Sequence, residues 1–362
     1  MKFTSIFFFL ISLIFSNKMQ AQQLHLSILP DLEGQELLDS LVSRYKTYQL
    51  LPYSICRDTL FSKIDVVQDS LECIYTGMKR YLPPGVDATE AVLLNGQANG
   101  INTEHTYPQS KGAEGYGRSD MHILYPSRVR TNSNRLNNPF GDIDDGVTQT
   151  WYYLTNEMSS PPSVNRNAYS ESTSTKFEPR ESVKGNIARS VFYFYTMYHG
   201  DAINADPNFF NLQVQDLCKW HFEDAVDSTE WKRTFGINEY QKNINPFVLD
   251  CSLAARTYCQ NISDVCALLS DTKNEKLIRS EFKLYPNPGV ELIILEHSLG
   301  SGNYAVYVND LHGKTVSTQH GFSDQNSIQI TLPYLPNGVY FIHFQHDKDA
   351  KFHVFKYISN PY

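Results

Sequence analysis

The chain of 362 residues is long enough for about two domains, and 41% hydrophobic residues suffice for packed cores. Only 19% of the residues are charged, which excludes a disordered tail or a coiled coil as the main architecture. The formal net charge of -8 argues against a broadly basic protein that coats nucleic acid, although a local basic groove can still bind phosphate because salt screens each charge beyond about 10 Å.

The first 21 residues are typical of a signal peptide, because Lys2 precedes an apolar run from Ile6 to Phe15 and the small residue Ala21 follows. The run is about half of the roughly 20 residues that a membrane-spanning helix needs, so we expect no transmembrane segment. Export permits disulfide bonds, and the cysteines that follow the expected cleavage site are Cys56, Cys73, Cys218, Cys251, Cys259 and Cys266. Their connectivity is not readable from the sequence.

Residues 22–270 hold every cysteine and tryptophan and are expected to form one mainly helical domain. Apolar residues at helical spacing predict helices over 35–50 and 183–198. The polar stretch 159–175, which contains two prolines, predicts a surface loop. A short β insertion is expected near 102–140, where residues that can carry chemistry are densest.

Within this dense region, Glu104 and His105 are followed by an asparagine-rich run that reaches Asn137. A neutral histidine can remove a proton from water, while carboxylate and amide oxygens are ligands that a hard divalent cation prefers. Neighbouring side chains on a strand point to opposite faces, so we expect a bend after His105 and an approach of Asn137 from a following helix. The pattern favours hydrolysis of phosphodiester bonds.

The segment 102–140, with Gly117-Arg-Ser-Asp-Met-His122 inside it, resembles the bacterial endonuclease I family of secreted or periplasmic His-Me finger nucleases. Further runs that resemble the family follow, at 177–180, 184–189, 220–221 and 241–247. The resemblance spans nearly the whole large domain. It implies a ββα-metal site and cleavage of DNA, and often RNA, with little sequence preference and with 5′-phosphate products.

Residue by residue, the resemblance implies that His105 is the general base and that Glu104 and Asn137 are ligands of a divalent cation, expected to be Mg²⁺, with Mn²⁺ or Ca²⁺ as alternatives. Arg118 matches the arginine that steadies the scissile phosphate through charge-assisted hydrogen bonds. His122 is expected to support the site rather than to act in catalysis. Asp120 is expected to have a structural role.

Basic residues elsewhere in the domain are candidate phosphate contacts: Arg135, Arg180, Lys184 and Arg189. A salt bridge that fixes the finger is the alternative for Arg135, and a solvated helix face is the alternative for the other three. Asn132 and Asn134 lie in an asparagine-rich turn, where amide side chains commonly cap the backbone, so Asn137 is preferred to them as a metal ligand.

Residues 271–281 are charged and free of aromatic residues, and they predict a linker. Residues 282–362 alternate in short runs typical of a small β-sandwich, with strands expected over 291–296, 304–309, 327–332, 339–345 and 351–358. The runs Leu284-Tyr-Pro-Asn-Pro288, Asp310-Leu-His-Gly-Lys314 and Leu335-Pro-Asn-Gly-Val-Tyr-Phe341 resemble a type IX secretion sorting domain. The resemblance implies passage through the type IX machinery, followed by release or surface attachment. A carbohydrate-binding or adhesive module is the alternative.

The sequence thus predicts an α+β protein: a secreted, metal-dependent, sequence-nonspecific endonuclease with a C-terminal sorting domain. It is expected to be monomeric and to act on DNA, with RNA as a further candidate substrate; the preference between the two is not readable from the sequence. Two other classes stay open. One is another secreted hydrolase, such as a peptidase or glycosidase, although the His-Glu-x-x-His motif of zinc peptidases is absent. The other is a non-catalytic surface protein that binds nucleic acid.

Overall fold

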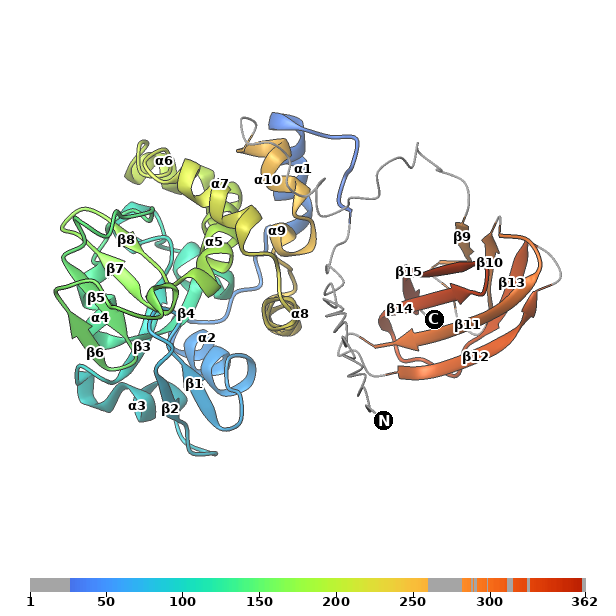
Figure 1. Ribbon diagram of the computed structural model, residues 1–362, viewed down its shortest axis with the longest axis horizontal. Helices are drawn as coiled ribbons and strands as arrows, with labels where there is room; N and C mark the ends of the chain where they lie inside the picture. The colour runs from blue at the N-terminus through green and yellow to red at the C-terminus, as the bar shows by residue number, and fades with distance from the viewer. Residues whose placement is uncertain are drawn as a thin grey trace, which may run out of the picture.

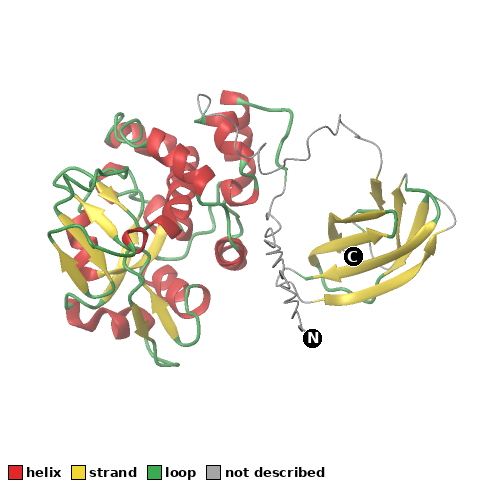
Figure 2. Cartoon of the chain, in the orientation of Figure 1, coloured by secondary structure: helices red, strands yellow, loops and turns green. Residues whose placement is uncertain are grey.

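The computed structural model describes residues 27–259 and, after them, 282–287, 289, 292–297, 299–310, 315–323 and 326–359. The expected signal peptide, residues 1–21, and the expected linker, residues 271–281, lie outside the described residues. Helices and short strands are mixed in 27–259, whereas the C-terminal part consists of strands, so the chain is α+β (Figures 1 and 2). In the part of the chain that is described, no helix is long and apolar enough to span a bilayer.

Three small sheets and a set of helices share one core in residues 27–259. The first half comprises α1 (Gly34–Tyr45), α2 (Tyr53–Thr59), a π-helical turn (Leu60–Ile64), β1 (Ser70–Glu72), β2 (Lys79–Tyr81), α3 (Ala88–Leu93), β3 (Ile101–His105), β4 (Leu124–Arg128) and α4 (Val129–Arg135). The second half comprises β5 (Thr150–Tyr153), β6 (Asn156–Met158), β7 (Ser170–Ser172), β8 (Phe177–Glu178), α5 (Lys184–Met197), α6 (His199–Ala205), α7 (Val214–Glu223), α8 (Ser228–Gln241), α9 (Pro246–Leu249) and α10 (Ser252–Thr257).

Helix α5 lies at the centre of this domain, with the strands and α2, α3 and α4 on one side and α1, α9 and α10 on the other (Figure 1). Almost all of its side chains are buried, because apolar and small residues continue around the whole helix rather than along one face. Gly185 shows how close the packing is: a Cβ atom there would lie 2.1 Å from the carbonyl oxygen of Asp224. The helices predicted over 35–50 and 183–198 are confirmed as α1 and α5, with the first ending earlier.

The prediction of a surface loop over 159–175 is wrong for the C-terminal end of that segment. Residues 170–172 form β7, a buried strand between β5 and β8. Its polar side chains find partners inside the protein, because Ser170 Oγ donates to the Tyr75 carbonyl at 2.7 Å and Ser172 Oγ lies 2.9 Å from the Tyr152 hydroxyl. Polar side chains can be buried when they are hydrogen-bonded in this way. The polarity of a sequence segment therefore does not reveal whether the segment is buried.

Two arginines, one buried and one largely buried, join helix α8 to the rest of the domain. Arg189 of α5 makes two hydrogen bonds with the Glu230 carboxylate of α8, at 2.7 and 2.6 Å. Arg233, one turn further along α8, binds Asp65 at 2.7 Å and donates to the carbonyl oxygen of Leu124 in β4. Helix α8 therefore holds both the central helix and the second strand of the β3–β4 hairpin.

A disulfide bond links Cys218 of α7 to Cys259, which follows α10, over 41 residues of chain. Cys251 is also disulfide-bonded. Cys56 and Cys73 are free thiols, and both are buried. The disulfide bonds in the helical half are consistent with the expected export. The two free thiols are buried and so are shielded from solvent.

The C-terminal residues form two antiparallel sheets with a separate core between them. One has the order β13-β10-β9 and the other β12-β11-β14-β15, from β9 (Phe282–Tyr285), β10 (Leu292–His297), β11 (Gly302–Asn309), β12 (Thr315–Ser323), β13 (Ser327–Thr331), β14 (Gly338–His346) and β15 (Asp349–Ser359). The alternation of the sequence predicted five of these strands, β10, β11, β13, β14 and β15. It missed β9 and β12.

Removing the Arg189 side chain should destabilise the domain, because Glu230 would keep a buried charge without its partner. We expect Arg189→Ala to lower the free energy of unfolding by about 3–5 kcal/mol. The exposed pair of Lys219 with Asp142 is the control, and Lys219→Ala should cost less than about 1 kcal/mol. Denaturant unfolding of both variants checks this, and equal effects would contradict it.

Buried neutral histidines should make the domain sensitive to acid. Burial, together with the charge of Arg189, lowers the pKa of His221 to about 3 from the usual 6.5. Below pH 6.5 the unfolded chain therefore binds a proton that folded His221 does not, and stability falls as the pH drops towards the folded pKa. We expect His221 to contribute a loss of about 2 kcal/mol between pH 7 and pH 5. Unfolding curves should show a smaller loss for His221→Gln, whose amide can still donate to Cys251; an unchanged loss would exclude this role.

Candidate active site

The expected β insertion is a hairpin followed directly by a helix. Strands β3 and β4 pair antiparallel, with Ile101 opposite Arg128 and His105 opposite Leu124. Helix α4 begins at Val129, the residue after β4. The order strand, strand, helix agrees with the arrangement that the sequence favoured for residues 102–140.

Asp120 fixes the long connection between the two strands. Its buried carboxylate accepts hydrogen bonds from the hydroxyls of Tyr193 and Tyr198, at 2.7 and 2.9 Å, and from the Gln241 side chain at 2.8 Å. It also caps the backbone N–H of His122 at 3.0 Å. Asp120 thus ties the connection to α5, in agreement with the structural role expected for it.

His105 is the last residue of β3, and its side chain is almost buried. Its Nε2 atom lies 3.0 Å from the carbonyl oxygen of Arg118. A carbonyl can only accept a hydrogen bond, so Nε2 carries the hydrogen and Nδ1 is the unprotonated nitrogen of the neutral ring. Burial lowers the pKa of His105 to about 4, with further contributions from nearby arginines, and this favours the neutral ring at pH 7.

Glu104, the neighbour of His105, is also buried, and it makes two contacts through the same oxygen. Its Oε1 accepts from the Tyr75 hydroxyl at 2.6 Å and lies 3.1 Å from Nη1 of Arg135. Burial raises the pKa of this carboxyl, and the charge of Arg135 opposes that rise. Both contacts use Oε1, and no hydrogen bond or ion pair from a described residue reaches Oε2, so this oxygen could accept another ligand.

Arg135, the last residue of α4, is a buried connector. Besides Glu104, its guanidinium donates to the carbonyl oxygens of His105 and Thr106, both at 3.1 Å. It also lies 4.5 Å above the ring of Phe140. With only 1% of its surface exposed, Arg135 fixes the end of β3, as the salt-bridge alternative proposed, and is not available to a phosphate in this structure.

The asparagines of the run behave differently from one another. Asn137 is exposed and lies beyond the end of α4, so it does not approach from the helix as expected. Within the described residues its side chain has no hydrogen-bond partner. Asn132, inside α4, reaches β3: its Nδ2 donates to Asn102 Oδ1 at 2.9 Å and to the Thr103 carbonyl at 3.3 Å. The amide of Asn132, with Oδ1 free of these contacts, therefore lies beside the strand that carries Glu104.

Tyr53, the first residue of α2, was not identified from the sequence. Its ring stacks on His105, with 5.6 Å between ring centroids. The guanidinium carbons of Arg118 and Arg57 lie 4.2 and 4.7 Å from the same ring. Tyr53 stands about fifty positions before His105, so no local motif joins them, and only the fold brings these side chains together.

The other candidate phosphate contacts are engaged inside the protein. Lys184 Nζ lies within 3.2 Å of Asp142, Glu178 and Glu181. Arg189 is bound to Glu230, as described above. Arg180 is held by Glu72, at 2.7 Å, and by the Ile74 carbonyl, at 2.9 Å. These cations are paired with acids of the same domain, some buried and some exposed, which explains why their spacing on the sequence does not mark a phosphate-binding face.

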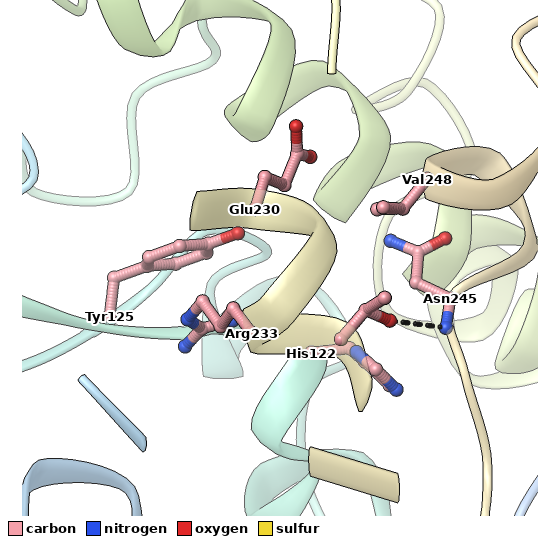
Figure 3. A pocket seen from close by; sticks show the side chains of 7 residues that line it. His122, Tyr125, Glu230, Arg233, Asn245 and Val248 are labelled. Atoms are coloured by element: carbon pink, nitrogen blue, oxygen red, sulfur yellow. Dashed lines mark hydrogen bonds between the residues drawn. The ribbon is translucent and has the colours of Figure 1, made fainter. Parts of the chain in front are cut away.

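His122 belongs to the core behind the hairpin. It lines a small cavity with residues of β4, α8 and α9, namely Tyr125, Glu230, Arg233, Thr234, Asn245 and Val248 (Figure 3). Its ring packs against Tyr193, and its Nε2 lies 3.4 Å from the Asn243 carbonyl. Burial lowers its pKa to about 4.

A metal centre at Glu104 would need mixed ligands. Among the residues that the structure describes, no group of three or more His, Cys, Asp or Glu side chains is placed to hold a metal ion. Glu104 Oε2 and Asn132 Oδ1 are hard oxygen donors on neighbouring elements, which suits a magnesium-type ion whose other ligands are waters and substrate oxygens. The donor set therefore fits a weakly held divalent cation rather than a structural zinc.

Comparison with known proteins gives two family matches. The model of the endonuclease I family matches residues 51–251, and that of a secretion system C-terminal sorting domain matches residues 283–357. Extracellular ribonucleases of Bacillus subtilis and Bacillus amyloliquefaciens are 32% and 34% identical to this chain over 43% and 42% of its length. The chain spans about half the length of these curated relatives, 53% and 52%.

Two solved structures overlap a smaller part of the chain. Latent dimeric PorU from Porphyromonas gingivalis is 18% identical over 22% of this chain and 9% of its own, with a TM-score of 0.19. CopC from Methylosinus trichosporium is 18% identical over 21% of this chain and 86% of its own, with a TM-score of 0.17. Scores this low do not support a shared overall fold.

The β3–β4–α4 arrangement around His105 lies inside the longer matched region, and the C-terminal strands lie inside the other. The first match covers more than half of the chain. The chain belongs to the endonuclease I family and carries a C-terminal sorting domain that directs it to the outside of the cell or to its surface.

Proposed function

We propose that the protein is an endonuclease that hydrolyses the phosphodiester bonds of DNA and RNA with little sequence preference. The observation that carries the proposal is the hydrogen bond from His105 Nε2 to the Arg118 carbonyl, which leaves Nδ1 as the proton acceptor beside Glu104. Membership of the endonuclease I family and the similarity to two extracellular ribonucleases agree with this activity.

In the proposed mechanism His105 Nδ1 removes a proton from a water molecule, and the water oxygen attacks the scissile phosphorus. The bond from phosphorus to the 3′ oxygen then breaks, and the departing 3′ oxygen takes a proton from solvent water, which leaves a 3′-hydroxyl and a 5′-phosphate product. The Arg118 carbonyl holds the ring throughout, because Nε2 keeps its hydrogen in both the neutral and the protonated form. Arg118 is exposed, which supports a role for its guanidinium in binding oxygens of the reacting phosphate.

We infer that Glu104 Oε2 and the amide oxygen of Asn132 would hold the divalent cation of a ββα-metal site. The position of Asn132 against β3 supports it over Asn137 as the second ligand. When bound, such a cation neutralises charge that builds on the phosphoryl and leaving oxygens. Mg²⁺ is the expected ion, with Mn²⁺ or Ca²⁺ as alternatives.

Recognition of the sugar-phosphate backbone explains why sequence would matter little, since phosphate contacts carry no base information. Passage through the type IX machinery by way of residues 282–362 would deliver the enzyme to nucleic acid outside the cell. We expect it to act as a monomer. Arg118 and Arg57 provide cationic groups at the site in a chain that is acidic overall.

Replacing His105 tests the proposed base. The purified protein should degrade plasmid and single-stranded DNA, and also RNA, with magnesium, and EDTA should stop the reaction. His105→Ala should lower kcat by a factor on the order of 10²–10⁴, because the proton acceptor is lost. His199 is exposed at the start of α6, so His199→Ala is the matched control and should keep full activity.

Gel-based and fluorescent nuclease assays would measure these rates. Full activity of His105→Ala would exclude the mechanism. A wild-type protein that binds nucleic acid but cleaves none would instead support the non-catalytic alternative.

Two asparagine variants test the metal ligands. Asn132→Ala should raise the magnesium concentration needed for half-maximal activity by roughly tenfold or more, as expected when about 1.4 kcal/mol of binding free energy is lost. Asn137→Ala, at an exposed site of the same run, should leave that concentration unchanged. Magnesium titrations of the cleavage rate decide between the two ligands, and the reverse pattern would restore Asn137 as the ligand.

A further inference from the structure

Arg57 lies in α2, outside every segment that the sequence associated with catalysis, and yet it shares one aromatic ring with the proposed active site. Tyr53 is that ring. It stacks on His105 and has both Arg118 and Arg57 within 4.7 Å of its centroid. Tyr53 and Arg57 are one helical turn apart, which puts them on the same face of α2.

Arg57 and Arg118 differ from most other arginines of the domain in having no carboxylate partner. Those that form ion pairs are Arg128, Arg130, Arg135, Arg166, Arg180, Arg189, Arg233 and Arg256. For Arg57 and Arg118 no such pair exists within the part of the chain that is described. In addition, Nε of Arg57 is buried and has no hydrogen-bond partner.

A guanidinium that rests on an aromatic ring keeps its planar fork of N–H donors free at the edge. Such a fork matches two oxygens of a phosphate. A guanidinium that forms no ion pair with a carboxylate also keeps its positive charge available for that phosphate. Among the described residues Arg44 and Arg80 also form no ion pair, but Arg44 is exposed on α1, and Arg80 donates to the Asn99 carbonyl at 2.6 Å. Neither shares a ring with His105.

We propose that Arg57 is a substrate-binding residue that contacts a backbone phosphate of the nucleic acid beside His105, and that Tyr53 is a positioning residue for Arg57, Arg118 and the imidazole. The ligand is a phosphodiester anion of the substrate strand. This inference rests on the proposed nuclease function and adds a second cation, from a different element, to the one that Arg118 supplies.

The test compares Arg57→Ala with Arg44→Ala, which removes the same charge from another helix of the domain. Arg57→Ala should raise KM for duplex DNA roughly tenfold, which corresponds to about 1.4 kcal/mol, because a charge-assisted hydrogen bond to the phosphate is lost. The slope of log KM against log salt should also fall by about 0.9, as expected for one lost phosphate contact. Arg44→Ala should change neither, and thermal unfolding should be similar for the two variants.

Conservative variants separate binding from folding. Arg57→Lys keeps the charge, so it should keep the salt slope while losing part of the affinity that the fork gives. Tyr53→Phe keeps the ring and should retain kcat and KM within about twofold, whereas Tyr53→Leu should lower kcat and raise KM together. If Tyr53 were only structural, Tyr53→Leu would lower the melting temperature, but the kcat and KM of its folded protein would match those of Tyr53→Phe.

The assignment is overturned if Arg57→Ala has the KM and salt slope of Arg44→Ala, or if its loss of activity follows only a loss of folded protein. Wild-type activity is measured first and separates this failure from that of the proposed function. An inactive wild type removes both, whereas an active wild type with an inert Arg57 removes the present inference alone.

Discussion

The proposed site depends on one buried guanidinium. Arg135, at the end of α4, donates to the carbonyls of His105 and Thr106 and pairs with the Glu104 carboxylate. These contacts fix the end of β3. They thereby fix the positions of Glu104 and His105, the two side chains that carry the proposed chemistry. Because the guanidinium is buried, its loss would leave Glu104 charged without a partner and two carbonyls without donors. Position and charge at the site therefore depend on the same group.

A second layer of contacts fixes the groups around this centre. Asp120 gathers two tyrosine hydroxyls and the Gln241 amide, and so holds the connection that carries Arg118. The Arg118 carbonyl then fixes the hydrogen on His105. The tautomer of the proposed base is thus set by the carbonyl of Arg118, and the position of that carbonyl depends on the buried carboxylate of Asp120, two residues further along the chain.

Periodicity and motifs predicted α1, α5 and most strands of the C-terminal sandwich, because these elements repeat an apolar pattern of period 3.6 or 2. They also placed Glu104 and His105 on a strand. They could not separate Asn132 from Asn137, since that depends on where α4 ends, nor find Tyr53, which reaches His105 only through the fold. Arg189 was expected at the substrate because a basic residue looks the same in sequence whether it is solvated or paired with a buried acid.

The pairing of Glu104 with Arg135 also bears on the state in which the protein can travel. A carboxylate in a metal site is usually a source of repulsion until its ion arrives, and many small metal-binding domains remain unfolded without it. Here the charge of Glu104 is already balanced by an internal cation, and Oε1 is satisfied by Tyr75. If Glu104 holds the ion as proposed, we therefore expect the chain to fold before the ion binds. The ion would then be needed for the proposed cleavage and not for reaching the native structure.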